Sequence, residues 1–105
     1  RDQFIALWEA RDSALVEMDL AHVYMHTGKI DQALALLESA RATWRSLEEP
    51  AGSAECGLSI GDCLIILQRN EDAVLAYREA AADFEQAGNH SQATMAIERV
   101  DSDLI

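Results

Sequence analysis

Hydrophobic residues recur along the chain at helical spacing, in stripes that are broken by short polar or glycine-containing segments. The first clear stripe runs from Leu15 to Met25 in steps of three and four residues and ends at Thr27-Gly28. Glycine readily adopts the left-handed backbone conformation that closes a helix. A second stripe runs from Ala33 to Leu47 and stops before Pro50. The pattern therefore predicts two helices joined by a tight turn.

The same pattern returns every 40 residues. The shift brings three hydrophobic columns into line, which are Phe4, Trp44 and Phe84, then Leu20, Ile60 and Val100, and then Tyr24, Leu64 and Leu104. Small residues also keep their places, since Ala33 aligns with Ala73 and Ala40 with Ala80. We therefore predict an all-α chain of repeated helical hairpins, in which the aromatic column packs between helices.

The repeat predicts a single domain of residues 1–105 that is built from successive units. We expect residues 1–10 to be the end of a preceding closing helix, 11–50 to be repeat one, 51–90 to be repeat two, and 91–105 to be the first helix of a following repeat or a cap. Such units bury one face only against their neighbours. The chain is therefore expected to be a fragment of a longer array, whose open ends offer a route to homo-oligomers.

Several residues of the first unit stand at the spacing of a known helical repeat: Leu20, Ala21, Tyr24, Gly28, Ala33, Leu37 and Ala40. On these positions the chain resembles the tetratricopeptide repeat family, in a subclass with longer helices than the common 34-residue repeat. The resemblance implies antiparallel helical hairpins stacked as a right-handed solenoid. The second unit has Gln68 where the turn glycine usually lies, which predicts a less secure turn there.

In this family the first helices of successive hairpins line a concave groove that binds peptides. Carried onto this chain, the resemblance implies the groove residues Leu15, Met18, His22, Met25, His26, Glu55, Leu58, Asp62, Ile65 and Ile66. Members that clamp acidic C-termini use Lys, Asn and Arg in the groove, whereas this chain has residues such as Asp19 and Ser59, so a clamp of that kind is not expected. For the two groove methionines, packing in the core is the favoured alternative.

The charge of the chain narrows the choice of partner. A net charge of -11, from 19 acidic and 8 basic residues, repels nucleic acid and anionic membranes. The charge is compatible with a basic peptide or protein as partner, although solubility alone is a sufficient and favoured explanation. The longest apolar run, Cys63 to Leu67, is far shorter than the roughly 20 residues of a membrane span.

One group of residues has a spacing that could bind a metal ion or make partner binding depend on pH. Asp19, His22 and His26 follow a helical spacing that suits a zinc ion. A hydrolytic zinc helix needs Glu directly after its first His, and Val23 stands there. Ordinary groove or surface histidines are the favoured alternative, and we expect no metal and no cofactor. Protonation of the two imidazoles near neutral pH would make binding pH-dependent, which is a separate hypothesis.

No arrangement of residues predicts catalysis, because the chain has neither a phosphate-binding loop nor a nucleophile elbow. Cys56 and Cys63 are too far apart on one helix for a disulfide and are expected to be buried thiols of a cytoplasmic protein. We predict a non-enzymatic scaffold module that binds a peptide or a protein through the groove. The alternative is a structural or self-assembly segment of a larger signalling or regulatory protein.

Overall fold

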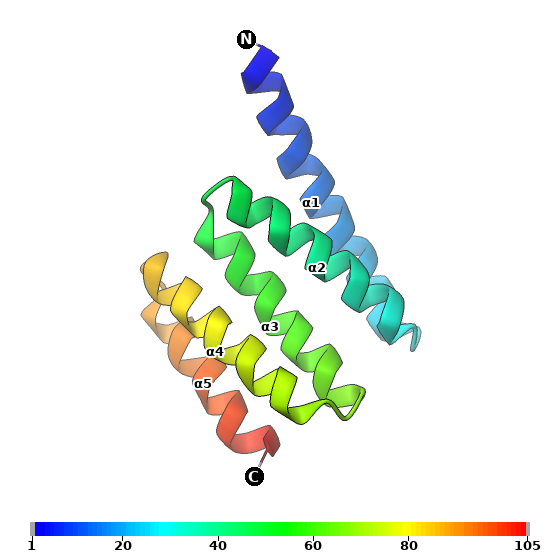
Figure 1. Ribbon diagram of the computed structural model, residues 1–105, viewed down its shortest axis with the longest axis vertical. Coiled ribbons are helices and arrows are strands. Elements are labelled where there is room, and N and C mark those ends of the chain that lie inside the picture. Colours follow the sequence, from blue (N-terminus) through cyan, green and yellow to red (C-terminus); the bar gives the residue numbers. More distant parts are fainter. Residues whose placement is uncertain (1, 105) are drawn as a thin grey trace.

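The computed structural model describes residues 2–104, with side chains for residues 3–100. In this range the chain forms five helices and no strand: α1 (Asp2–His26), α2 (Ile30–Ser46), α3 (Pro50–Ile66), α4 (Asn70–Gln86) and α5 (His90–Leu104) (Figure 1). Each helix packs against the next one along the chain. The predicted all-α architecture of repeated hairpins is confirmed.

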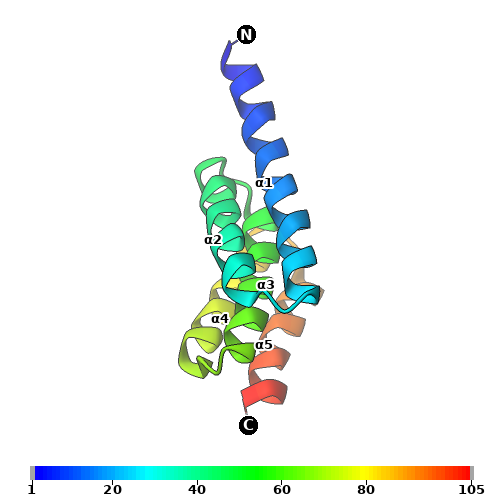
Figure 2. The same ribbon diagram turned by 90° about the vertical axis from the view of Figure 1, so that its right-hand side faces the viewer.

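The helices form two layers, with α2 and α4 in one and α1, α3 and α5 in the other (Figure 2). The molecule is a slab of 50 × 32 × 17 Å. Because α1, α3 and α5 are the first helices of successive hairpins, they share one broad face of this slab. The second helices of the hairpins cover its opposite side.

All four turns use one backbone design. Helices α2 to α5 start 20 residues apart, at Ile30, Pro50, Asn70 and His90. At the α1–α2 turn the N–H of Gly28 donates to Met25 O at 3.4 Å and the N–H of Lys29 to Tyr24 O at 2.8 Å. The other turns repeat this pair of bonds, which satisfies carbonyls that the helix end leaves unpaired.

The turn design corrects the expectation for Gln68. Gly28 and Gly88 have φ of 81° and 82°, and Gln68 and Glu48 take the same left-handed conformation at 60° and 57°. The N–H of Gln68 donates to Ile65 O at 3.0 Å, so the α3–α4 turn closes like the others. The two hydrogen bonds and the packing of both helices outweigh the cost of about 1–2 kcal/mol for a side chain in this conformation.

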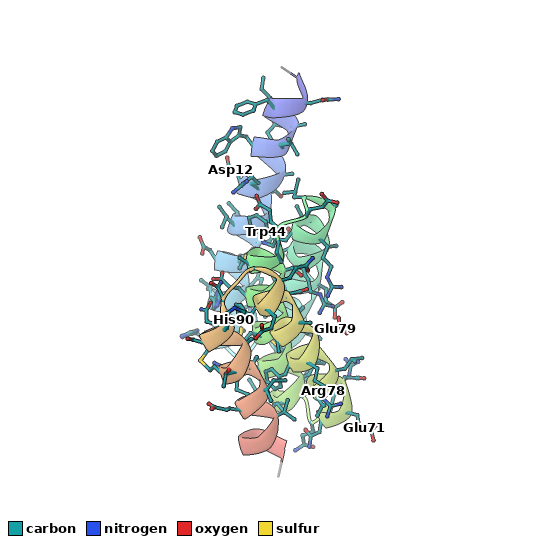
Figure 3. The ribbon with its side chains drawn as sticks, turned by 90° about the vertical axis from the view of Figure 1, so that its left-hand side faces the viewer. Asp12, Trp44, Glu71, Arg78, Glu79 and His90 are labelled. Atoms are coloured by element: carbon teal, nitrogen blue, oxygen red, sulfur yellow. The ribbon has the colours of Figure 1, made fainter. Side chains whose placement is uncertain are left out.

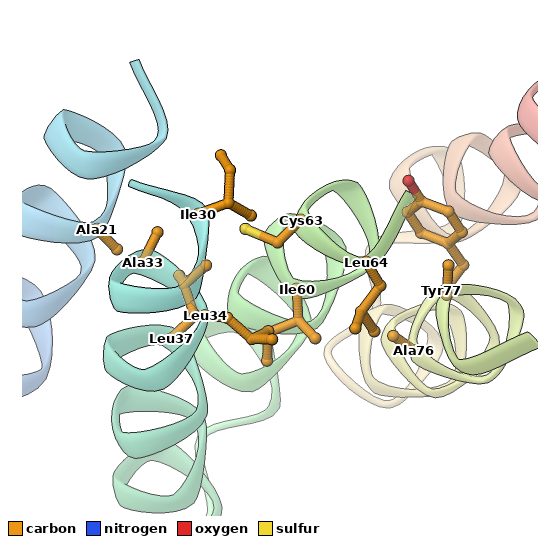
Figure 4. Packing of buried hydrophobic residues seen from close by; sticks show 11 residues of the cluster. Ala21, Ile30, Ala33, Leu34, Leu37, Ile60, Cys63, Leu64, Ala76 and Tyr77 are labelled. Atoms are coloured by element: carbon orange, nitrogen blue, oxygen red, sulfur yellow. The ribbon is translucent and has the colours of Figure 1, made fainter. Parts of the chain in front are cut away.

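The core lies between the two layers and is divided into three hydrophobic clusters. The central cluster joins α1 to α4 through residues such as Ala21, Leu37, Ile60 and Tyr77 (Figure 4). A second cluster surrounds Phe84 between α3, α4 and α5, and a third surrounds Trp44 between α1, α2 and α3. The predicted packing roles of these two aromatic residues are confirmed.

Two glycines of α3, Gly57 and Gly61, lie directly against α4. A Cβ atom on Gly61 would lie 2.6 Å from Cδ1 of Tyr77, well inside van der Waals contact. One on Gly57 would lie 3.1 Å from Cβ of Ala80, which is tight but nearer to a normal contact. Gly61 therefore provides the space that the Tyr77 ring fills.

The expectation for residues 1–10 is wrong. Of these, residues 2–10 do not end a separate helix; they are the first part of α1, which runs without a break from Asp2 to His26. No Gly or Pro stands between Trp8 and Ala14 to stop the helix. Phe4, placed by the repeat in the aromatic column, is 62% exposed because no helix covers it, and its ring contacts that of Trp8 edge-on with centroids 6.0 Å apart.

Candidate functional site

The face formed by α1, α3 and α5 presents equivalent positions of successive hairpins in rows. One row holds Leu15, Glu55 and Met95, each 40 residues from the next, and all three are exposed. Leu15 leaves half of its surface uncovered. Glu55 takes part in no ion pair or hydrogen bond within the described part of the chain. This row therefore offers two apolar side chains on either side of a carboxylate.

The two methionines predicted for the groove are packing residues. Met18 is only 9% exposed, and its Sδ accepts a hydrogen bond from Nε1 of Trp44 at 3.3 Å. Met25 is half-buried and packs on the central cluster. The groove assignment of Met18 is thus wrong, because the large Trp44 indole on α2 packs against Met18 and buries it. The alternative of core packing holds for both residues.

His22 and His26 lie on the exposed surface of α1. The Nδ1 of His22 donates to Met18 O at 2.7 Å, and the Nδ1 of His26 donates to His22 O at 2.9 Å. Each imidazole is thus held against its own helix, one turn back. Among the residues that the structure describes, no three His, Cys, Asp or Glu side chains come together in a way that would hold a metal ion.

Asp62 lies on α3 in a hydrogen-bonded network that links three helices. Its Oδ1 accepts from the Tyr77 hydroxyl on α4 at 2.6 Å, and its two oxygens accept from Nη1 of Arg99 on α5 at 2.8 and 2.7 Å. Burial alone would lower the pKa of Arg99, but the hydrogen bond and charge of Asp62 outweigh it and raise that pKa. The carboxylate of Asp62 is therefore compensated inside the protein.

The sequence reasoning missed Arg99. The 40-residue repeat could have indicated it. Arg99 aligns with Ser59, which lies three residues, or about one helical turn, before Asp62 on the same helix. Its positive charge belongs to the same face and offsets one carboxylate there.

Of the remaining predicted groove residues, some pack against the core and others are exposed. Leu58 and Ile65 are half-buried and pack against the core clusters, so they present only an edge to solvent. Ile66 is exposed at the end of α3. The accessible part of the predicted set is therefore Leu15, His22, His26, Glu55 and Ile66, to which the structure adds Met95.

A separate hollow of about 430 Å³ lies between the α2–α3 turn and the end of α4. Ser53, which is buried there, donates its hydroxyl hydrogen to Asp83 Oδ2 at 2.7 Å and accepts a hydrogen bond from Nε of Arg45 at 3.2 Å. Arg45 also pairs with Glu79 at 3.1 Å, one of the charged α4 side chains labelled in Figure 3 with Arg78 and Glu71. These polar groups pair with one another and tie α2, α3 and α4 together.

The two thiols are not nucleophiles at neutral pH. Cys56 and Cys63 are both free and buried, and they lie in different core clusters. Burial raises the pKa of Cys56 to about 12, with a further contribution from the charge of Glu55, and it raises that of Cys63 to about 11, with a contribution from Asp62. Their role in the described structure is packing.

None of the described helices is long and apolar enough to cross a membrane. In a comparison with known families, residues 12–86 match a model described as tetratricopeptide repeat. The match begins on α1 and ends at the last residue of α4. Searches of curated proteins and of solved structures gave no match.

Proposed function

Because the chain belongs to the tetratricopeptide repeat family, whose helical hairpins form protein-interaction modules, we propose that it binds a peptide segment of a partner protein on the face of α1, α3 and α5. The observation that carries the proposal is the row of Leu15, Glu55 and Met95, which places exposed apolar groups of α1 and α5 on either side of an exposed carboxylate of α3. Exposed apolar side chains that recur across one face favour a binding surface.

The charges of this face favour a peptide with basic residues. Glu55 and Asp19 are exposed and make no ion pair with the described residues. Asp62 adds no net negative charge, because Arg99 compensates it. The whole chain, at a net charge of -11, would also draw a basic ligand toward it. The expected ligand therefore has apolar anchors for Leu15 and Met95 and a Lys or Arg for Glu55.

Recognition of an acidic C-terminus does not fit these charges. The cation on the described part of this face, Arg99, already makes two hydrogen bonds to Asp62. A carboxylate ligand would have to displace Asp62 and leave it uncompensated. The two buried free thiols support a reducing compartment, and we place the module in the cytoplasm.

A peptide library displayed on phage tests the proposal, with selected peptides then titrated against variants of the protein. Leu15→Gln removes an exposed apolar contact, and Glu55→Lys reverses the charge. Each should weaken binding about tenfold, or about 1.4 kcal/mol. Leu15→Gln loses apolar burial, and Glu55→Lys turns attraction of the ligand's Lys or Arg into repulsion. The matched controls are Leu75→Gln and Glu71→Lys, which alter exposed residues of α4 in the outer layer. They should leave the affinity unchanged.

Two results would refute binding on this face. One is a library that yields no peptide specific for the folded protein. The other is a set of peptides whose affinity falls equally in the face variants and in the α4 controls.

The alternative is a structural segment that self-associates through its open ends. It has its own supporting observation, since Phe4, Leu7 and Trp8 are exposed on the part of α1 that projects past α2. Light scattering joined to size-exclusion chromatography separates the two functions. A monomer at all concentrations favours peptide binding, and a dimer that Trp8→Gln abolishes favours self-association.

A further inference from the structure

Helix α1 has a second apolar stripe on the side away from its buried residues. Val16, Leu20 and Val23 follow one another at steps of four and three, so they share one face of the helix. They are 64%, 40% and 56% exposed. The face of α1 that packs into the core holds Ala14 and Ala21 instead. We call the three residues the α1 edge.

The equivalent stripe on α3 is covered by a neighbouring helix. The equivalents of the α1 edge on α3, 40 residues later, are Cys56, Ile60 and Cys63. These three are buried, with exposures of 0%, 2% and 0%. Helix α2 covers them, since they share core clusters with its residues Leu37 and Trp44.

We propose that the α1 edge is a docking site for an amphipathic helix of another polypeptide, with an apolar face flanked by Lys or Arg. Such a helix would cover Val16, Leu20 and Val23 as α2 covers their equivalents on α3. The site continues an interface that the molecule already builds between its own helices.

The acidic surroundings of the edge determine the charge of the partner. Asp12 stands four residues before Val16, and Asp19 four before Val23, so both carboxylates lie beside the stripe. Both are exposed and make no ion pair with the described residues. Figure 3 shows Asp12 on the part of α1 that rises past Trp44. A second copy of this chain, with the same carboxylates and a net charge of -11, is a poor occupant.

Among residues whose side chains the structure describes, α5 shows no comparable stripe. Its positions that would receive a following helix are Thr94 and Glu98, in register with Ala14 and Met18 of α1. Both are polar, so the described part of this α5 face is suited to contact water. Docking of an apolar helix is therefore expected at the α1 edge.

The α1 edge is distinct from the peptide-binding face proposed above. Successive residues of a helix are about 100° apart around its axis, so Leu15 and Val16 point in different directions. Loss of binding at one surface can thus be measured without loss at the other.

The probe for the edge is a labelled peptide with the sequence of Ile30–Ser46, the helix that covers the equivalent stripe on α3. In the basic version, Lys replaces Asp31 and Glu38, which are exposed in α2. Fluorescence anisotropy measures binding of both versions to the intact protein. The basic peptide should bind, and more tightly than the unsubstituted one, and added salt should weaken it.

Variants locate the site. Leu20→Gln, and independently Val23→Thr, should weaken binding of the basic peptide about tenfold. Because both residues are exposed, the variants should retain the circular dichroism of the parent protein. Leu15→Gln on the peptide-binding face and Leu75→Gln on α4 are the controls and should bind as the parent does. These two controls separate the edge from the function proposed above.

Three results would overturn the proposal. The basic peptide does not bind the folded protein, or it binds Leu20→Gln and Val23→Thr as tightly as the parent. The third result is a dimer of the protein that Leu20→Gln abolishes, which would show that a second copy occupies the edge.

Discussion

Gly61 stands where the ring of Tyr77 crosses α3, and its replacement by Ala would test how closely the two layers fit. An added Cβ would lie 2.6 Å from Cδ1 of Tyr77, so the ring has to move by about 1 Å to reach normal contact. Tyr77 is buried, and its hydroxyl donates to Asp62 at 2.6 Å. The shift would therefore also strain a hydrogen bond that links α4 to α3.

The expected effect of Gly61→Ala is the difference of two opposing contributions. Ala stabilises a helix interior by about 1 kcal/mol relative to Gly. Overpacking costs about 1–3 kcal/mol, and disturbance of the hydrogen bond to a charged acceptor adds roughly 1.5–3 kcal/mol. We expect the free energy of unfolding to fall by about 1.5–5 kcal/mol, which lowers the melting temperature of a domain of this size by at least about 6 °C.

Urea and thermal unfolding followed by circular dichroism at 222 nm measure this change. The matched control is Gly57→Ala in the same helix, where the added Cβ would lie 3.1 Å from Cβ of Ala80. The smaller overlap leaves most of the helix gain, so Gly57→Ala should be closer to neutral. A Gly61→Ala protein as stable as the parent, or more stable, would refute the proposed fit of Tyr77 against α3.

Three further perturbations have defined outcomes. Trp44→Ala empties the centre of the α1–α2–α3 cluster and should cost about 3–5 kcal/mol in urea unfolding, with failure to fold as the upper limit. Gln68→Gly relieves the left-handed backbone at φ 60° and should stabilise the protein by about 0.5–1 kcal/mol, whereas an unchanged melting temperature would argue against strain there. Burial raises the folded-state pKa of Cys56 to about 12 and that of Cys63 to about 11, above the ordinary 9.0, so the folded state retains these protons at higher pH. Their contribution to stability is complete below about pH 9 and is lost as the pH rises through 11 to 12, which unfolding as a function of pH measures.

The sequence predicted the features that depend on local spacing. The stripes of apolar residues and the turn glycine Gly28 indicated the helices and their C-terminal ends correctly, although not the start of α1 at Asp2, and the 40-residue columns identified Trp44 and Phe84 as packing residues. A repeat records what each position contacts inside the array. It does not determine where each helix begins, so Phe4, assigned by its column to a closing helix, lies exposed on α1.

The candidate site was predicted less completely because it depends on contacts between helices. Spacing on α1 placed Met18 in a groove, but the reach of the Trp44 indole from α2 decides its burial. Asp62 was expected to line the groove, and its neutralisation by Arg99 requires knowledge of how α5 lies on α3. The predictions for Leu15 and Glu55 needed only the face of one helix, and both residues are exposed.

The most direct test of the central claim is a map of backbone amide shifts, recorded by nuclear magnetic resonance on labelled protein titrated with a library-selected peptide. We predict that the largest shifts cluster around Leu15, Glu55 and Met95, on the face shared by α1, α3 and α5. Shifts confined to the outer layer of α2 and α4, or to the hollow beside Ser53, would contradict the account.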